Sequence, residues 1–305
     1  MKKEKVTREW VEAELSKGRK QFEDIDMQGL YLAELDFTGV TFINVCLREA
    51  NITDAKLDFC YFENSDISYA NFRGSRIMSS TFKGCEAVEV GFNGSSLYNS
   101  CMSDMEMIMP SFIETNLNNS YINNVRLINA TFKYTSFMQA FINECVITVN
   151  GNIDKCCFHM ARIAFTTFSN VRIQNSDLSN SVILHTRFIG SNLVNCKQTN
   201  ITLVHTDLRE LDPTDGGNVE CTTDLCNSII IASNIRDANL ENANMTGTTM
   251  ASNGVIGAWF GGADFTGADL SKQNFFDSNF SESTKGIKHP FTGGIVEMDE
   301  SVDKE

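Results

Sequence analysis

Few side chains in this sequence have a type and spacing that could support catalysis or metal binding. Cys157 lies two residues before His159, and a thiol beside an imidazole can act as a nucleophile. His185 lies 20 residues before His205, with Asp207 close by, and two imidazoles with a carboxylate can bind a metal ion. No third ligand recurs at this spacing. We therefore expect no catalytic residue, no metal site and no cofactor, and we predict that the protein is not an enzyme.

Catalytic motifs and cysteine spacing support the same prediction. The chain contains no G-x-S-x-G motif, no Walker loop and no dinucleotide-binding fingerprint. Its ten cysteines include no C-x-x-C pair, and the first residues have no apolar stretch typical of a secretory signal. We therefore expect reduced thiols and a cytoplasmic location.

The dominant pattern is an apolar residue at every fifth position. It runs through residues 22–147, resumes after a one-residue shift near Asn150 as 153–208, and continues as 225–280. Gln198 is the single polar residue in these series. An α-helix repeats every 3.6 residues and a strand every two, so neither explains a period of five.

A second inward position accompanies the first. The residue two places before the apolar one is small in many units, as at Ala50, Cys60 and Ser65. A coil with short flat sides explains both positions, because each side then points one large and one small residue inward.

Units such as ANFRG (70–74), ANLEN (238–242) and ADFTG (263–267) resemble the A-(D/N)-L-x-x consensus of the pentapeptide-repeat family. The resemblance implies an all-β fold, the right-handed quadrilateral parallel β-helix, in which four pentapeptides make one coil. It implies little about function, because members of this family do many different things.

Residues before the repeats predict a cap. Thr7 is a typical N-cap, residues 8–17 have a helical pattern, and Gly18 is a typical C-terminal stop. Such a helix can cover the exposed end of the first coil with its apolar side chains, which are Trp10, Val11 and Leu15. The chain is thus expected to contain five segments: the helical cap 1–21, β-helix 22–208, a projecting loop 209–224, β-helix 225–281 and an irregular acidic tail 282–305.

Stacked coils place residues 20 apart in columns on the surface. One column is acidic and consists of Asp66, Glu86 and Glu106. Another ends on two aromatic residues and includes Tyr61, Tyr121 and Phe141. Stacked like charges are unfavourable, and aromatic residues next to them are typical of protein-binding surfaces. Ordinary surface variation is the alternative interpretation.

The predicted loop 209–224 interrupts the period and is rich in acids, which include Glu210, Asp212, Asp215 and Glu220. A β-helix does not need such a loop, so it is a candidate binding element. A tolerated surface insertion explains it equally well.

The net charge of −14 argues against direct nucleic-acid binding, and no apolar run reaches the ~18–20 residues of a membrane span. We expect a non-enzymatic rod that binds a protein partner with a basic surface; its oligomeric state stays open. The chain also resembles quinolone-resistance members of the family, which implies, as an alternative, a DNA-mimicking modulator of DNA gyrase or topoisomerase IV. A second alternative is a secreted bacterial effector, delivered into a host cell, or the β-helix part of an effector ubiquitin ligase.

Overall fold

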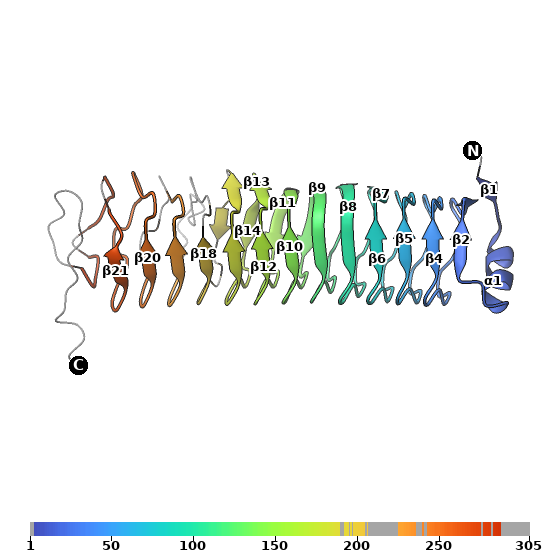
Figure 1. Ribbon diagram of the computed structural model, residues 1–305, viewed down its shortest axis with the longest axis horizontal. Helices are drawn as coiled ribbons and strands as arrows, with labels where there is room; N and C mark the ends of the chain where they lie inside the picture. The colour runs from blue at the N-terminus through green and yellow to red at the C-terminus, as the bar shows by residue number, and fades with distance from the viewer. Residues whose placement is uncertain are drawn as a thin grey trace. The chain divides into compact units, whose positions relative to one another are not determined.

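Each five-residue period forms one side of a four-sided coil, and successive coils stack through parallel backbone hydrogen bonds. In β5 (Tyr61–Glu63) and β6 (Thr81–Lys83), Tyr61 pairs with Thr81 and Phe62 with Phe82, a step of 20 residues. The computed structural model is therefore a right-handed quadrilateral parallel β-helix, which confirms the fold class predicted from the sequence (Figure 1).

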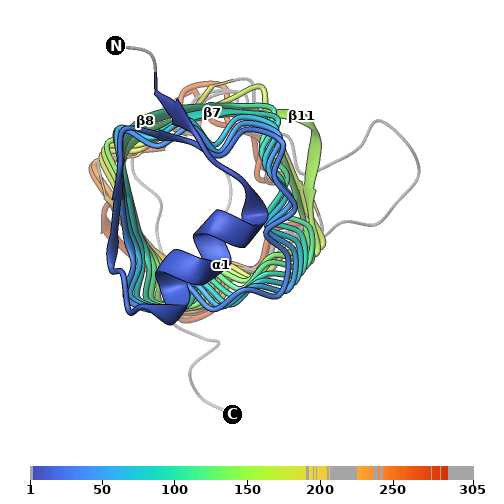
Figure 2. The ribbon, with the colours of Figure 1, turned by 90° about the vertical axis from the view of Figure 1, so that its right-hand side faces the viewer.

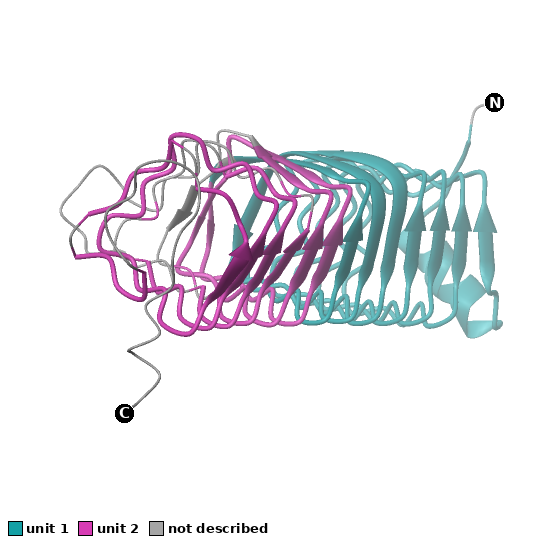
Figure 3. Ribbon diagram, turned by 60° about the vertical axis from the view of Figure 1, so that its left-hand side comes forward, with its two compact units in different colours: residues 1–151 teal, residues 152–305 magenta. Residues whose placement is uncertain are grey.

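The structure describes residues 3–189, 192–194, 196, 198–204, 206, 225–235, 240, 243–275, 277–281 and 283–287. The chain divides into two compact units, residues 1–151 and 152–305 (Figure 3). Their boundary coincides with the one-residue shift of the period, since the buried residues Ile147 and Ile153 are six positions apart. The predicted loop 209–224 and residues 288–305 of the predicted tail lie outside the described residues.

Unit 1 contains the N-terminal helix and most of the longer strands. Its elements are β1 (Glu4–Lys5), α1 (Arg8–Ser16), β2 (Gln21–Glu23), β3 (Ile25–Asp26), β4 (Thr41–Ile43), β5, β6, β7 (Glu86–Val88), β8 (Cys101–Ile108), β9 (Tyr121–Lys133) and β10 (Phe141–Asn143). Strand β11 (Val146–Asp154) crosses the boundary.

Unit 2 repeats the short strands. They are β12 (Arg162–Ala164), β13 (Thr167–Ser169), β14 (Arg172–Gln174), β15 (Val182–Leu184), β16 (Arg187–Ile189), β17 (Asn192–Val194), β18 (Thr202–Val204), β19 (Ile229–Ile231), β20 (Thr249–Ala251) and β21 (Asp269–Lys272). Between β18 and β19 the register step is 27 residues, because Leu203 pairs with Ile230. The extra residues belong to the stretch that contains the predicted loop.

The core of each unit consists of the fifth-position side chains stacked on their equivalents. In unit 1 every such position from residue 22 to residue 147 is buried. The rings of Phe42, Phe62 and Phe82 stack nearly parallel, with centroids 4.6 and 4.5 Å apart. In unit 2 the polar exception, Gln198, is also buried, and its Nε2 atom has no hydrogen-bond partner among the residues that the structure describes.

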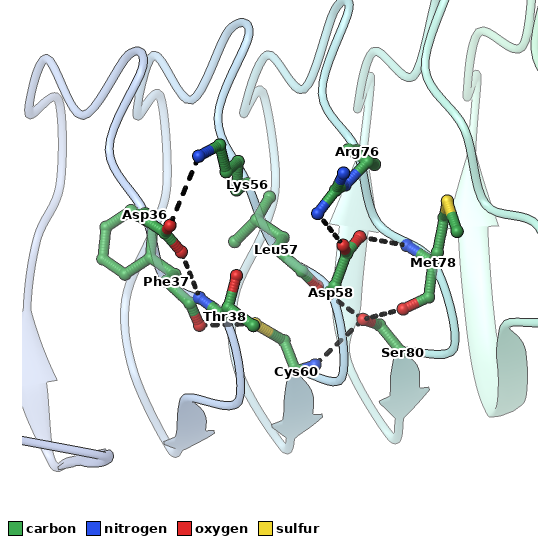
Figure 4. Close-up of polar contacts among 10 residues, drawn as sticks. All are labelled: Asp36, Phe37, Thr38, Lys56, Leu57, Asp58, Cys60, Arg76, Met78 and Ser80. Atoms are coloured by element: carbon green, nitrogen blue, oxygen red, sulfur yellow. Dashed lines mark hydrogen bonds and ion pairs between the residues drawn. The ribbon is translucent and has the colours of Figure 1, made fainter.

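The small inward residues connect the coils by hydrogen bonds. Ser80 Oγ donates to the carbonyl oxygen of Leu57 (2.5 Å) and accepts from the amide of Cys60 (2.9 Å) (Figure 4). Cys60 Sγ lies 3.0 Å from the carbonyl oxygen of Phe37, and burial raises the pKa of this thiol to about 12. Serine and cysteine at this position thus serve as inter-coil donors, and the buried cysteines are inert packing residues.

Helix α1 covers the first coil of unit 1, as Figure 2 shows. Thr7 Oγ1 accepts from the amide of Trp10 (3.3 Å), and the helix ends at Ser16, one residue earlier than expected. Val11 is fully buried, and the Trp10 ring packs edge-on against Phe22 with centroids 6.0 Å apart. The helix therefore shields apolar core surface that the end of the stack would expose to water.

Replacing Ser80 by alanine tests the inter-coil hydrogen bonds. Ser80→Ala leaves the Cys60 amide and the Leu57 carbonyl without their side-chain partner, and it should lower the free energy of unfolding by about 1–3 kcal/mol. Ser96→Ala, at a half-buried outward position, should change it by less than about 0.5 kcal/mol. Urea unfolding measures both, and equal effects would refute the proposed role of Ser80.

Candidate functional site

The predicted acidic column forms on one face of unit 1. Asp66 pairs with Glu86, and Glu86 with Glu106, in parallel register. The backbones of adjacent coils lie about 4.8 Å apart. Within the described residues Asp66 and Glu86 have no ion-pair partner, whereas Glu106 pairs with Arg126 Nη1 one coil further on (2.6 Å). The like charges thus form a ladder, and Arg126 neutralises the acid at one end of it, Glu106.

The predicted aromatic column forms on the adjoining face. Tyr61 pairs with Thr81, Thr81 with Cys101, and Cys101 with Tyr121. Tyr121 then stacks on Phe141 with ring centroids 4.8 Å apart and planes inclined by 14°. The stack is partly exposed, with Tyr121 at 45%.

Strands β8 and β9 connect the two faces, because both run around the corner between them (Figure 1). Cys101 of the aromatic column and Glu106 of the acidic column belong to the same strand, β8. Tyr121 and Arg126 are related in the same way in β9. The structure therefore places the two predicted columns on neighbouring faces.

An apolar column beside the acidic one was missing from the sequence prediction. Val88 pairs with Ile108, and Ile108 with Ile128, and all three side chains are half-buried. Glu86 and Val88 are two residues apart on one strand, as are Glu106 and Ile108, so their side chains lie on the same side of the sheet. The same 20-residue spacing, applied to the residue after each core position, would have revealed this column. We call the two columns together, Asp66, Glu86, Glu106, Val88, Ile108 and Ile128, the acidic–apolar face.

Bulky residues stand at the corner next to this face. Tyr69 and Met109 have left-handed backbone conformations, with φ of 60° and 54°, and both are exposed. Glycine or asparagine fits this conformation with less strain. The guanidinium carbon of Arg48 lies 4.6 Å from the centre of the Tyr69 ring. The corner therefore extends the apolar surface at a cost in backbone strain.

Half a coil away, acids and bases neutralise one another. Lys56 Nζ lies 3.5 Å from Asp36 Oδ2, and Arg76 pairs with Asp58 (Figure 4). Hydrogen bonds from Thr38, together with the Lys56 ammonium, hold the pKa of Asp36 below its usual value. This face thus lacks the excess negative charge of the acidic–apolar face.

The thiol–imidazole pair of the sequence does not form. His159 Nδ1 lies 2.9 Å from Ser179 Oγ, which itself donates to Asp177 Oδ1 (2.5 Å). Since the serine proton goes to Asp177, it is not available to His159. Within the described residues Cys157 is not among the hydrogen-bond partners of His159.

Of the predicted histidine pair and the predicted loop acids, the structure describes only His185. His185 stacks on Phe165 with ring centroids 4.9 Å apart, but His205 and Asp207 lie outside the described residues. So do the four predicted loop acids, Glu210, Asp212, Asp215 and Glu220. In the part of the chain that the structure describes, no three His, Cys, Asp or Glu residues are placed to hold a metal ion. Of the same residues, none belongs to a helix long and apolar enough to cross a membrane.

Neutralising Glu86 should stabilise the protein. Glu86→Gln removes the central charge of the ladder and its repulsion with both neighbours, which should raise the free energy of unfolding by about 0.5 kcal/mol. Glu106→Gln also breaks the pair with Arg126 and should bring no gain. Urea unfolding at low salt measures both, and about 1 M salt should remove the difference. A loss of stability in Glu86→Gln would contradict the proposed repulsion between Glu86 and the two acids next to it.

Comparison with known proteins identifies the repeat. A protein-family model described as pentapeptide repeats matches eight copies in residues 46–84 and 256–284, one stretch in each unit. No curated protein matches the sequence.

Several solved structures match this chain, each with a low TM-score. HetL, a pentapeptide repeat protein involved in heterocyst differentiation regulation from the cyanobacterium Nostoc sp. strain PCC 7120, is 16% identical, with 87% of this chain and 95% of that chain covered and a TM-score of 0.23. Full-length QnrB1, a plasmid-mediated fluoroquinolone resistance protein, is 12% identical, with coverages of 68% and 94% and a TM-score of 0.26. A mannuronic acid specific polysaccharide family 6 lyase from human gut microbiota is 11% identical, with coverages of 93% and 84% and a TM-score of 0.34. None of these carries an argument about function.

The family assignment rests on the repeats themselves. The eight matched copies lie in both units, and most of the described residues between them keep one large and one small inward side chain per side, with Met105 and Ile201 as exceptions at the small position. Both units of the chain therefore contain pentapeptide repeats.

Proposed function

We propose that the protein is a non-enzymatic binding module whose acidic–apolar face binds a protein partner carrying basic and apolar side chains. The observation that carries the proposal is the placement of the acidic column directly beside the half-buried apolar column. The two columns share two coils, at Glu86–Val88 and at Glu106–Ile108. In the acidic column, Asp66 and Glu86 have no ion-pair partner among the described residues. Apolar residues flanked by charges are typical of the centre and rim of a protein interface.

The spacing of the columns favours a partner helix. Each coil adds about 4.8 Å along the stack, close to the 5.4 Å rise of one helical turn. A helix lying along the columns can therefore place one apolar side chain near each of Val88, Ile108 and Ile128. Basic residues next to that apolar stripe would then face Asp66 and Glu86, and such amphipathic helices are a common recognition element.

The second candidate, a DNA-mimicking modulator of DNA gyrase or topoisomerase IV, is supported by the net charge of −14. The ion pairs of unit 1 weigh against it, because Lys56, Lys83 and Arg126 each lie close to an acid one coil away. These pairs leave a short acidic ladder, whereas duplex DNA presents a long uninterrupted one.

A cytoplasmic location is part of the proposal. All nine cysteines that the structure describes are free thiols, and buried free thiols are typical of proteins in reducing compartments.

Affinity capture from the source cells with matched variants tests the binding face. The bait Glu86→Lys/Ile108→Ser reverses one charge and removes apolar surface, so the specific partner should be depleted at least tenfold. Ser96→Lys, an outward substitution half a coil away, should retain it. A bait lacking residues 209–224 shows whether the predicted loop contributes. Partner lists that are identical for all baits would contradict the proposal.

A supercoiling assay with purified DNA gyrase or topoisomerase IV distinguishes the DNA mimic from the binding module. The binding-module proposal predicts no effect at micromolar protein. Inhibition or protection that Glu86→Lys abolishes would instead favour the DNA mimic.

A further inference from the structure

The aromatic column, which the proposed function does not use, borders a corner of unit 1 with almost no charge. Three neighbouring columns meet there: the aromatic column, the corner residues two positions before it, and the residues three positions before it. Among their members from residue 58 to residue 141, only Asp58 is charged, and it is buried and paired with Arg76. We call this surface the uncharged corner. Its bulky side chains are Phe59, Met78, Tyr98, Tyr121, Met138 and Phe141.

Phe59 is the most exposed large apolar side chain of the described residues, at 67%. Its φ is 58°, a left-handed conformation that Gly39 and Asn99 adopt at equivalent corner positions with less strain. Tyr98 and Met138, on the adjoining side, are exposed as well. The corner thus carries strained and water-exposed apolar side chains next to one another, which is typical of an interaction surface.

Polar side chains of the corner bond to one another across coils. Asn118 Oδ1 accepts from the amide of Met138 (2.9 Å), and Asn99 Nδ2 donates to Ser79 Oγ (3.1 Å). Burying these groups against another surface therefore leaves few of them without a partner, so excluding water from this corner costs little.

Bulky and small side chains lie on opposite sides of the corner. In three successive coils a bulky residue on one side accompanies a smaller one on the other: Met78 with Thr81, Tyr98 with Cys101, and Tyr121 with Asn118. A two-fold axis parallel to the stack exchanges the two sides of the corner. Two copies related by this axis therefore place each bulky side chain of one opposite the smaller residue of the other.

Charge favours a second copy as the partner. Each chain has a net charge of −14, so two copies repel one another through most of their surface. A contact that brings the same surface of both copies together needs a surface without charge, and the uncharged corner is one. Tyr, Phe and Met are also enriched at the centre of protein interfaces, where charged residues are depleted. We propose that the protein forms a parallel, two-fold symmetric homodimer through the uncharged corner.

Sedimentation velocity tests the dimer with matched variants. The full-length protein at tens of micromolar and physiological salt should sediment with twice the chain mass of 34.0 kDa. Phe59→Asn removes the exposed ring and gives this corner the residue that Asn99 already places at it, so the variant should fold and should dimerise at least tenfold more weakly. Tyr69→Asn, at an exposed left-handed position on another corner, should dimerise like the parent protein.

Disulfide crosslinking tests the symmetry. The proposed axis places residue 99 of one copy opposite residue 99 of the other, so oxidised Asn99→Cys should migrate as a linked dimer on a non-reducing gel. Asn64→Cys is the control, because Asn64 is also exposed and left-handed but lies on a different corner. It should stay a monomer on the same gel.

Three results would refute the dimer. They are a parent protein that is monomeric throughout this concentration range, a dimer that Phe59→Asn leaves unchanged, and equal crosslinking from positions 64 and 99. None of them bears on the acidic–apolar face, because Phe59 and Asn99 lie outside it. Loss of partner capture in Glu86→Lys/Ile108→Ser would likewise leave the dimer untouched.

Discussion

The parallel hydrogen bonds between coils impose a 20-residue register, and both the core and the surface of unit 1 depend on it. Phe62 lies between Phe42 and Phe82 because the backbones of the three coils are in register, which places the centroids of neighbouring rings 4.6 and 4.5 Å apart. The same register fixes the outward side chains. A residue on the surface therefore has its equivalents 20 positions before and after it as neighbours, whatever their chemical type.

The sequence contains this register, so much of the structure could be predicted from it. The inward positions and the acidic column of Asp66, Glu86 and Glu106 follow from the period. The Thr7 cap follows from the local helix signals that precede the repeats. Residues close in the sequence predicted side-chain contacts less well than residues 20 positions apart. Cys157 and His159 are close in sequence, yet His159 bonds to Ser179, the residue 20 positions on.

The main feature that sequence reasoning missed is the apolar column of Val88, Ile108 and Ile128, which follows the core residues instead of preceding them. It is a surface feature, for which burial sets no requirement. The 20-residue spacing locates such a column only when each outward position is compared from coil to coil, and the sequence prediction compared only the residue before each core position.

The proposed function requires that a protein partner binds the acidic–apolar face. The most direct test is to introduce a photo-crosslinking amino acid at Ile108 and, in a separate variant, at Ser96 half a coil away, and to irradiate the source cells. If the partner binds this face, irradiation gives one discrete product crosslinked to another protein from position 108 and none from position 96. A product from position 96 alone, or the same product from both positions, would contradict it.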